Sequence, residues 1–156
     1  RYLNLPIEEL KKAAIAQMKD GQPVWFGCDV GKHSERDSGI MDLDIRGLED
    51  LLDTRFTMTK AERLDYGQSL MTHAMVFAGV NLDENGKPNR WRVENSWGKE
   101  PGKDGYYLMT DRWFDEYMYQ VVVNKKYLTA EQIAAYEAEP IALEPWDPMG
   151  SLAVVR

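Results

Sequence analysis

The chain has 156 residues, of which 44% are hydrophobic and 29% are charged, a composition typical of one globular domain with a hydrophobic core. Its net charge of −7 argues against a broad nucleic-acid surface, which needs clustered lysine and arginine. The single cysteine excludes an internal disulfide and fits a reducing compartment. No apolar run approaches membrane-spanning length, so no membrane partner is expected. Because the chain begins at Arg1 rather than at methionine, we interpret it as a piece of a longer polypeptide.

The N-terminal part of the chain predicts a helix followed by a buried strand. Apolar residues recur at helical spacing over residues 4–20, where Pro6 suits the first turn and Gly21 suits the position after the end. Residues 24–30 form an aromatic, apolar run between turn residues, which is typical of a buried strand. The polar residues 31–39 are predicted to form a loop.

The middle of the chain predicts two short helices and then a β-hairpin. Leucines between residues 48 and 52 indicate one or two helical turns. The residues Thr59-Lys60-Ala61-Glu62 have the pattern of a capping box, which opens a second helix. Residues 74–82 and 91–95 are predicted to be strands, because the turn between them contains Asn-Gly.

The C-terminal part predicts further strands, two helices and a tail. Strands are expected at 106–110 and 120–124, with an aromatic helix at 111–117 between them. A second capping box opens a helix over residues 129–137. The tail after Pro140 contains further prolines and is predicted to be extended.

These elements together predict an α+β fold, with an antiparallel sheet and helices at both ends of the chain. We expect residues 1–140 to form a β-rich lobe. Residues 141–156 are expected to form an extended C-terminal arm.

His73, at the start of a predicted strand, is the first candidate for chemistry. A histidine titrates near neutral pH, so it can activate a thiol and later protonate a leaving amine. Asn95 ends the next predicted strand, where its side-chain carbonyl could orient the imidazole, and Trp97 could cover the pair and exclude water. Each residue also has a structural interpretation: a hydrogen-bonded histidine, a turn asparagine and a core tryptophan.

Two other residues give weaker signals. Cys28 lies in the middle of the first predicted strand, whereas a reactive thiolate prefers a helix N-terminus or an electropositive cleft, so we interpret it as buried and structural. His33 lies in a polar loop beside carboxylates, and a solvated loop explains it better than a metal site. Because no spacing of His, Cys and carboxylates repeats in a zinc-like way, no metal or other cofactor is expected.

Several motifs spread along the chain carry a family resemblance. They are Thr72-His73-Ala74-Met75, Trp91-Arg92-Val93-Glu94-Asn95-Ser96-Trp97-Gly98, Gly105-Tyr106, Trp113-Phe114, Tyr119-Gln120-Val121-Val122-Val123 and Pro145-Trp146-Asp147-Pro148-Met149-Gly150. Together they resemble the bleomycin hydrolase and bacterial aminopeptidase C family of papain-like cysteine peptidases. The likeness covers nearly the whole chain and is densest over residues 71–153.

The resemblance implies a papain-like fold, of which this chain is the C-terminal β-rich lobe with flanking helices, and an aminopeptidase activity on peptides. It implies that His73 is the catalytic histidine, Asn95 its orienting residue and Trp97 their shield. Ala74 would help to line the pocket for the substrate's side chain. The tail through Ala153 would enter the active-site cleft, where a terminal carboxylate selects the free amino group of the peptide.

The resemblance also implies a homohexamer with internal active sites and a cytoplasmic location. Two departures from the family pattern matter. The nucleophilic cysteine and the oxyanion-hole glutamine of the family lie in an N-terminal portion that this chain lacks. The tail continues past Ala153 with Val154-Val155-Arg156, and we expect the working enzyme to lose these residues or to bend them aside.

Three hypotheses remain open at this point. In the first, the chain is the C-terminal part of a cysteine aminopeptidase, inactive alone and dependent on the missing N-terminal portion. In the second, it is a non-catalytic structural or oligomerisation half-domain. In the third, it is a freestanding thiol enzyme that uses Cys28, which rapid alkylation of that residue would support.

Overall fold

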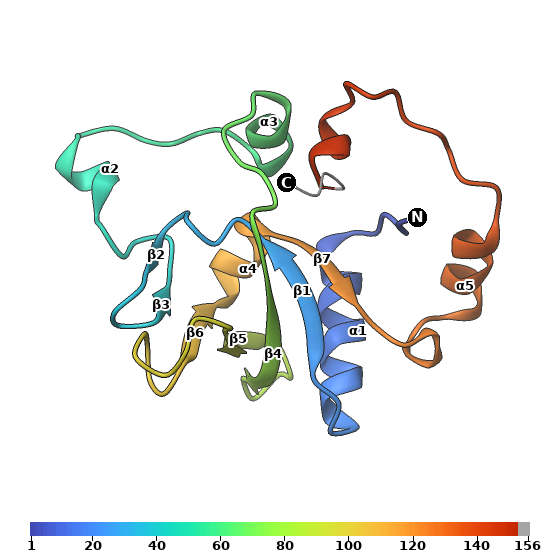
Figure 1. Ribbon diagram of the computed structural model, residues 1–156, viewed down its shortest axis with the longest axis horizontal. Helices are drawn as coiled ribbons and strands as arrows, with labels where there is room; N and C mark the ends of the chain where they lie inside the picture. Colours follow the sequence, from blue (N-terminus) through green and yellow to red (C-terminus); the bar gives the residue numbers. More distant parts are fainter. Residues whose placement is uncertain (153–156) are drawn as a thin grey trace.

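Seven strands and five α-helices make up residues 1–152, which are the residues that the computed structural model describes (Figure 1). The strands are β1 (Val24–Cys28), β2 (Ser34–Glu35), β3 (Ile40–Met41), β4 (His73–Leu82), β5 (Pro88–Glu94), β6 (Tyr106–Thr110) and β7 (Met118–Val122). The helices are α1 (Ile7–Lys19), α2 (Leu48–Leu51), α3 (Lys60–Asp65), α4 (Asp111–Tyr117) and α5 (Ala130–Glu137), with 3-10 turns η1 (Lys125–Tyr127) and η2 (Pro148–Leu152).

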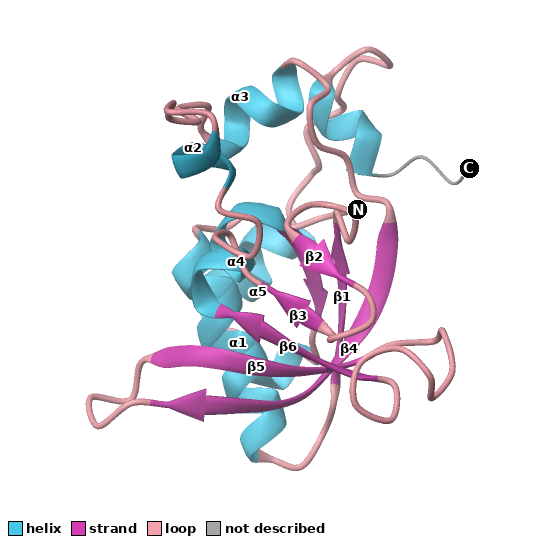
Figure 2. Cartoon of the chain, turned by 90° about the vertical axis from the view of Figure 1, so that its left-hand side faces the viewer, coloured by secondary structure: helices cyan, strands magenta, loops and turns pink. Residues whose placement is uncertain are grey.

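The strands form one curled sheet in the order β2-β3-β6-β5-β4-β1-β7 (Figure 2). Its neighbouring strands are antiparallel except for β3 and β6, which run parallel with Ile40 opposite Leu108. Among the predicted strands β1, β4, β5, β6 and β7, neighbours are therefore antiparallel, and the sheet is mixed only through β3, which the sequence analysis did not predict. Strand β3 pairs with β2 in a short hairpin and lies beside β6 with no tight turn between them. Strands β3 and β6 can therefore run parallel.

Helices α1 and α4 pack on one face of the sheet (Figure 2). Between that face and α4 lies a cluster of stacked rings. Phe26 and Phe77 stack with ring centroids 3.8 Å apart, and Trp91 lies 4.9 Å from Phe77 and 4.6 Å from Phe114. All four side chains are buried, so this cluster fixes β1, β4 and β5 against α4.

Short-range signals in the sequence set the helix ends. Both predicted capping boxes form, with the Thr59 and Thr129 hydroxyls accepting from the backbone N–H groups of Glu62 and Gln132. Pro6, expected in the first turn, instead precedes the first helix, because its ψ of 146° is extended. That helix consequently starts at Ile7 and not at residue 4.

The strand 106–110 and the helix 111–117 have the predicted bounds, and several other elements differ. The predicted loop 31–39 contains β2, and β7 starts two residues before the predicted strand. The predicted extended tail contains the 3-10 turn η2. Ala153 and Val154-Val155-Arg156 lie outside the described residues. Among the helices of residues 1–152, none combines the length and apolarity needed to cross a membrane.

Candidate active site

The geometry of the sheet brings His73 and Asn95 together. His73 is the first residue of β4, and Asn95 directly follows β5. These strands are antiparallel neighbours, with Val76 opposite Glu94, so the start of one lies beside the end of the other. His73 Nε2 lies 2.9 Å from Asn95 Oδ1, which confirms the predicted pairing of the two side chains.

The neighbouring hydrogen bonds define which ring nitrogen carries the proton. The backbone N–H of Ser96 donates to the same Asn95 atom at 2.8 Å, so that atom is the amide oxygen. An amide oxygen only accepts, and His73 Nε2–H must therefore be the donor. In the neutral imidazole, this leaves the lone pair of Nδ1 free to accept a proton.

Trp97 covers the imidazole as the sequence predicted. Its ring stacks on His73 with centroids 4.9 Å apart and an interplanar angle of 30°. The edge of Tyr107 meets Trp97 at 6.2 Å, and the Arg36 guanidinium lies 5.9 Å from the indole centroid. Trp97 remains 40% exposed, so it is a surface cover over the histidine and not a core residue.

The loop after Asn95 depends on Gly105. The carbonyl oxygen of Gly105 accepts from the backbone N–H of Asn95 at 3.2 Å, which fixes the residue that orients His73. Gly105 has a φ of +82°, a conformation that favours glycine. A Cβ at this position would also lie 2.6 Å from the carbonyl oxygen of Gly98, so the loop requires glycine here.

Tyr107 is a site residue that the sequence analysis missed, because nothing distinguishes it from other aromatic strand residues. It is buried beneath Trp97, and burial raises the pKa of its phenol, while the nearby Asn95 side chain opposes the rise. Within residues 1–152, neither Tyr107 Oη nor Asn95 Nδ2 has a partner in hydrogen-bond geometry. The site thus contains two buried polar atoms, one in Asn95 itself and one in Tyr107, whose hydrogen-bonding capacity these residues leave unused.

Cys28 lies beside His73 but is not a reactive thiol. The two residues are opposite one another in the β1–β4 register, so proximity alone does not exclude a reaction. However, Cys28 is fully buried, and burial, followed by the charge of Asp29, raises the pKa of its thiol far above the ordinary value. The interpretation of Cys28 as a buried structural residue is confirmed.

Ala74 lies exposed beside a crowded surface. It is opposite Gly27 on β1, over which the side chains of Met71 and Gln120 meet, with Gln120 Nε2 2.8 Å from Met71 Sδ. A Cβ at residue 27 would collide with Met71 Sδ. A group binding next to Ala74 would therefore find Met71 and Gln120 as its neighbours.

His33 is partly buried and not simply solvated. Its ring stacks on Tyr117 with centroids 5.7 Å apart, and its φ of 45° is left-handed. A search of residues 1–152 for three or more His, Cys, Asp or Glu side chains placed to hold a metal ion finds no such group.

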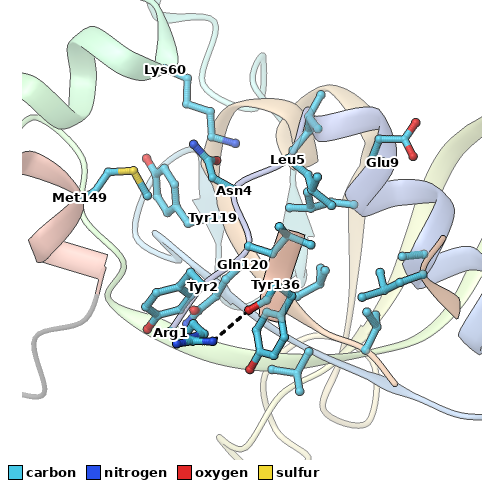
Figure 3. Close-up of a pocket in the computed structure, with 18 of the residues that line it drawn as sticks. Arg1, Tyr2, Asn4, Leu5, Glu9, Lys60, Tyr119, Gln120, Tyr136 and Met149 are labelled. Atoms are coloured by element: carbon cyan, nitrogen blue, oxygen red, sulfur yellow. Dashed lines mark hydrogen bonds between the residues drawn. The ribbon is translucent and has the colours of Figure 1, made fainter. Parts of the chain in front are cut away.

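A cavity lies away from the histidine pair. It has a volume of about 730 Å³ and lies between the N-terminal segment, α1, α3, β7, α5 and η2 (Figure 3). Arg1 forms part of its wall, and its guanidinium donates to the Tyr136 carbonyl at 3.1 Å. Neither His73 nor Asn95 lines this cavity, so the pocket and the candidate active site are separate features.

Comparisons with known proteins give consistent matches over nearly the whole chain. Residues 1–150 match the model of the Peptidase C1-like family. Aminopeptidase C of Listeria monocytogenes serovar 1/2a is 58% identical over 154 residues, which is 99% of this chain and 35% of the relative. Bleomycin hydrolase of Homo sapiens is 51% identical over 155 residues, which is 97% of this chain and 34% of the relative.

A solved structure gives the same result. The crystal structure of PepW from Lactobacillus rhamnosis HN001 is 56% identical and superposes with a TM-score of 0.90, covering 96% of this chain and 34% of that one. The chain thus spans about a third of the length of the relatives it matches.

Proposed function

Because the chain belongs to the Peptidase C1-like family, we propose that it is the C-terminal portion of a cysteine aminopeptidase that releases N-terminal residues from peptides. The observation that carries the proposal is the hydrogen bond from His73 Nε2 to Asn95 Oδ1, which leaves Nδ1 as a base. The names of the relatives, aminopeptidase C and bleomycin hydrolase, support the choice of substrate class.

In the proposed reaction, Nδ1 of His73 removes the proton from a cysteine thiol, and the thiolate attacks the carbonyl carbon of the first peptide bond. The tetrahedral intermediate collapses, and the leaving amine takes the proton from the imidazolium. Water then attacks the thioester, with Nδ1 again as the base, and releases the amino acid and the thiol. Asn95 keeps the ring in one tautomer throughout, and Trp97 keeps water away from their hydrogen bond.

The thiol in this proposal comes from an upstream portion of the same polypeptide, since Cys28 is buried and its thiol is not activated. The same upstream portion is proposed to pack over the apolar cavity of Figure 3, one wall of which is formed by residues 1–5. The tail through Ala153 is proposed to enter the cleft, where a terminal carboxylate selects the substrate's ammonium group once Val154-Val155-Arg156 are lost or bent aside. The assembled enzyme is proposed to be a cytoplasmic homohexamer.

One observation favours a second candidate function. Within residues 1–152, the single cysteine is inaccessible, so the chain by itself has no sulfur for His73 to activate. A chain that works without the upstream portion would therefore be a non-catalytic structural or oligomerisation module.

Hydrolysis of an aminoacyl fluorogenic amide separates the two functions. The chain alone should be inactive, and the full-length protein should show activity that a thiol alkylator abolishes. His73→Ala in the full-length protein should lower kcat by about 10² to 10⁴-fold, the usual contribution of a general base. His33→Asn is the matched control, because asparagine tolerates the left-handed backbone of residue 33, and its activity should stay near wild type.

Normal turnover by full-length His73→Ala would refute the catalytic assignment. Inactive full-length wild-type protein that still assembles would favour the structural role. Rapid alkylation of Cys28 in the folded chain would instead revive the hypothesis of a freestanding thiol enzyme.

A further inference from the structure

The segment that leads into His73 has no regular structure of its own. Residues 66–72 connect the end of α3 to the start of β4 without forming helix or strand. His73 is the first residue of β4, so strand pairing fixes it on one side only. The position of its side chain also depends on whatever holds the residues immediately before it.

The carboxylate of Asp29 holds that segment. Asp29 directly follows β1 and is only 4% exposed. Its Oδ2 accepts from Ser69 Oγ at 2.8 Å and from the backbone N–H of Leu70 at 3.2 Å. Its Oδ1 accepts from Thr72 Oγ1 at 3.2 Å, so one carboxylate binds three of the four residues before His73.

Two further contacts complete this arrangement. The backbone N–H of Thr72 donates to the Cys28 carbonyl at 2.9 Å, so the residue before His73 is tied to β1 through both its backbone and its side chain. The hydroxyls of Ser69 and Tyr119 lie 2.5 Å apart, which links the segment to β7. Ser69 is only 1% exposed, so its hydroxyl and the Asp29 carboxylate meet in the protein interior.

We propose that Asp29 is a positioning residue that holds the imidazole of His73 in register with Asn95 by fixing residues 69–72. The role rests on the proposed function, because it matters only if His73 is the base. Asp29 touches no reacting atom. It acts through Thr72, the covalent neighbour of His73, and a buried carboxylate with three donors resists displacement because each unmatched donor would be left unsatisfied.

The arrangement explains why a carboxylate stands here rather than a neutral acceptor. Two oxygen atoms meet three donors at once, and an ionised acceptor strengthens each hydrogen bond. Asparagine at this position would keep one oxygen for Ser69 and Leu70, while its amide could donate to Thr72 Oγ1, since a hydroxyl both donates and accepts. Alanine would leave all three donors without this partner.

Nuclear magnetic resonance of the 15N-histidine-labelled chain tests the inference directly, because imidazole nitrogen shifts report the tautomer of His73. In wild type, the Nε2–H tautomer should dominate. Asp29→Ala should mix the two tautomers, Asp29→Asn should restore most of the wild-type population, and Thr72→Val should give an intermediate shift. In the full-length protein, Asp29→Ala should lower kcat about ten- to a hundredfold while KM stays within about twofold.

Asp83→Ala is the matched control, because Asp83 directly follows the other end of β4 and its carboxylate also accepts hydrogen bonds from a neighbouring segment, here from the backbone N–H groups of Asn85 and Lys87. It should weaken that turn and leave the His73 signals unchanged. If Asp29→Ala fails to fold, Thr72→Val alone decides the question.

Wild-type tautomer populations in folded Asp29→Ala, or in Thr72→Val where the alanine variant does not fold, would overturn the inference. This failure is distinct from failure of the proposed function. If the proposed function fails but the inference holds, Asp29→Ala will still shift the His73 tautomer, while full-length His73→Ala will keep its turnover.

Discussion

The two ends of the β4–β5 hairpin differ in the hydrogen-bond partners that stabilise them. At the end where Leu82 meets Pro88, the chain turns back at once, and Asp83 accepts from the backbone of Asn85 at 2.9 Å and of Lys87 at 2.8 Å. At the other end, the strands separate, and His73 and Asn95 lie at their tips.

The difference lies in where the partners of each end come from. The turn supplies its own acceptors within a few residues. The open end is held by groups remote in sequence, namely Asp29 for the segment before His73 and Gly105 for Asn95. A strand end that is held from outside can present side chains to a ligand, whereas a closed turn uses its polar groups on itself.

The largest expected effect comes from removing a buried side chain that holds the β4–β5 hairpin, and with it both of its ends, against the core. Trp91 is fully buried between Phe77 and Phe114, and its Nε1–H donates to Asp111 at 3.0 Å. Trp91→Ala should lower the free energy of unfolding by about 3–5 kcal/mol, measured by urea denaturation. Trp146→Ala, at a residue 80% exposed, should change it little, and equal losses in the two variants would contradict the placement of the core.

A pair of glycine substitutions compares the two ends directly. Gly86, in the turn, has a φ of +77° and open space where a Cβ would lie, so Gly86→Ala should cost only the backbone strain of about 1–2 kcal/mol. Gly105→Ala adds a backbone collision at 2.6 Å and should cost more. Denaturation curves give both values, and a larger loss for Gly86→Ala would reverse the comparison.

A pH-dependent effect concerns the buried ammonium of Lys60, which holds α3, the helix before the open end. The Lys60 ammonium donates to the carbonyls of Asp115 and Met118 near the end of α4, and burial lowers the pKa of Lys60 to about 8 from 10.5. Between these values, the unfolded chain binds more protons than the folded one. The wild-type free energy of unfolding should therefore rise, relative to Lys60→Met, as pH increases from about 8 to about 10.5.

Urea denaturation across this pH range measures that difference. Groups whose ordinary pKa lies in this range, such as the tyrosines, are present in both proteins, so their contributions to the free energy of unfolding cancel in the difference. If the difference in free energy of unfolding between wild type and Lys60→Met stays constant over this pH range, the ammonium of Lys60 is not desolvated in the folded state.

Local signals explain what the sequence revealed about the fold. The residues 111–117 of α4 and both capping-box helices were predicted with the right starts, because their signals lie within four residues. The parallel pairing of β3 with β6 had no such signal, since β3 has only two residues and its partner lies far along the chain. The implied family membership and α+β fold are confirmed.

The candidate site likewise has one part that the sequence predicted and one part that it did not. The pairing of His73 with Asn95 followed from two strand ends joined by a short turn. The contacts of Asp29 with Ser69 and Thr72 join residues about forty positions apart, and no pattern in the sequence marks them. The catalytic roles of His73, Asn95 and Trp97, and the binding roles of Ala74 and Ala153, stay predictions.

The sheet order has a consequence for how the chain folds. Strands β4, β5 and β6 follow one another and form a local meander, whereas β1 must pair with β7, where Trp25 meets Val122 about a hundred positions away. Such a pairing closes a long loop and comes late and slowly. During synthesis, the meander with His73 and Asn95 emerges before β7. The edge of the sheet beside β1 can therefore be completed only after β7 has been made.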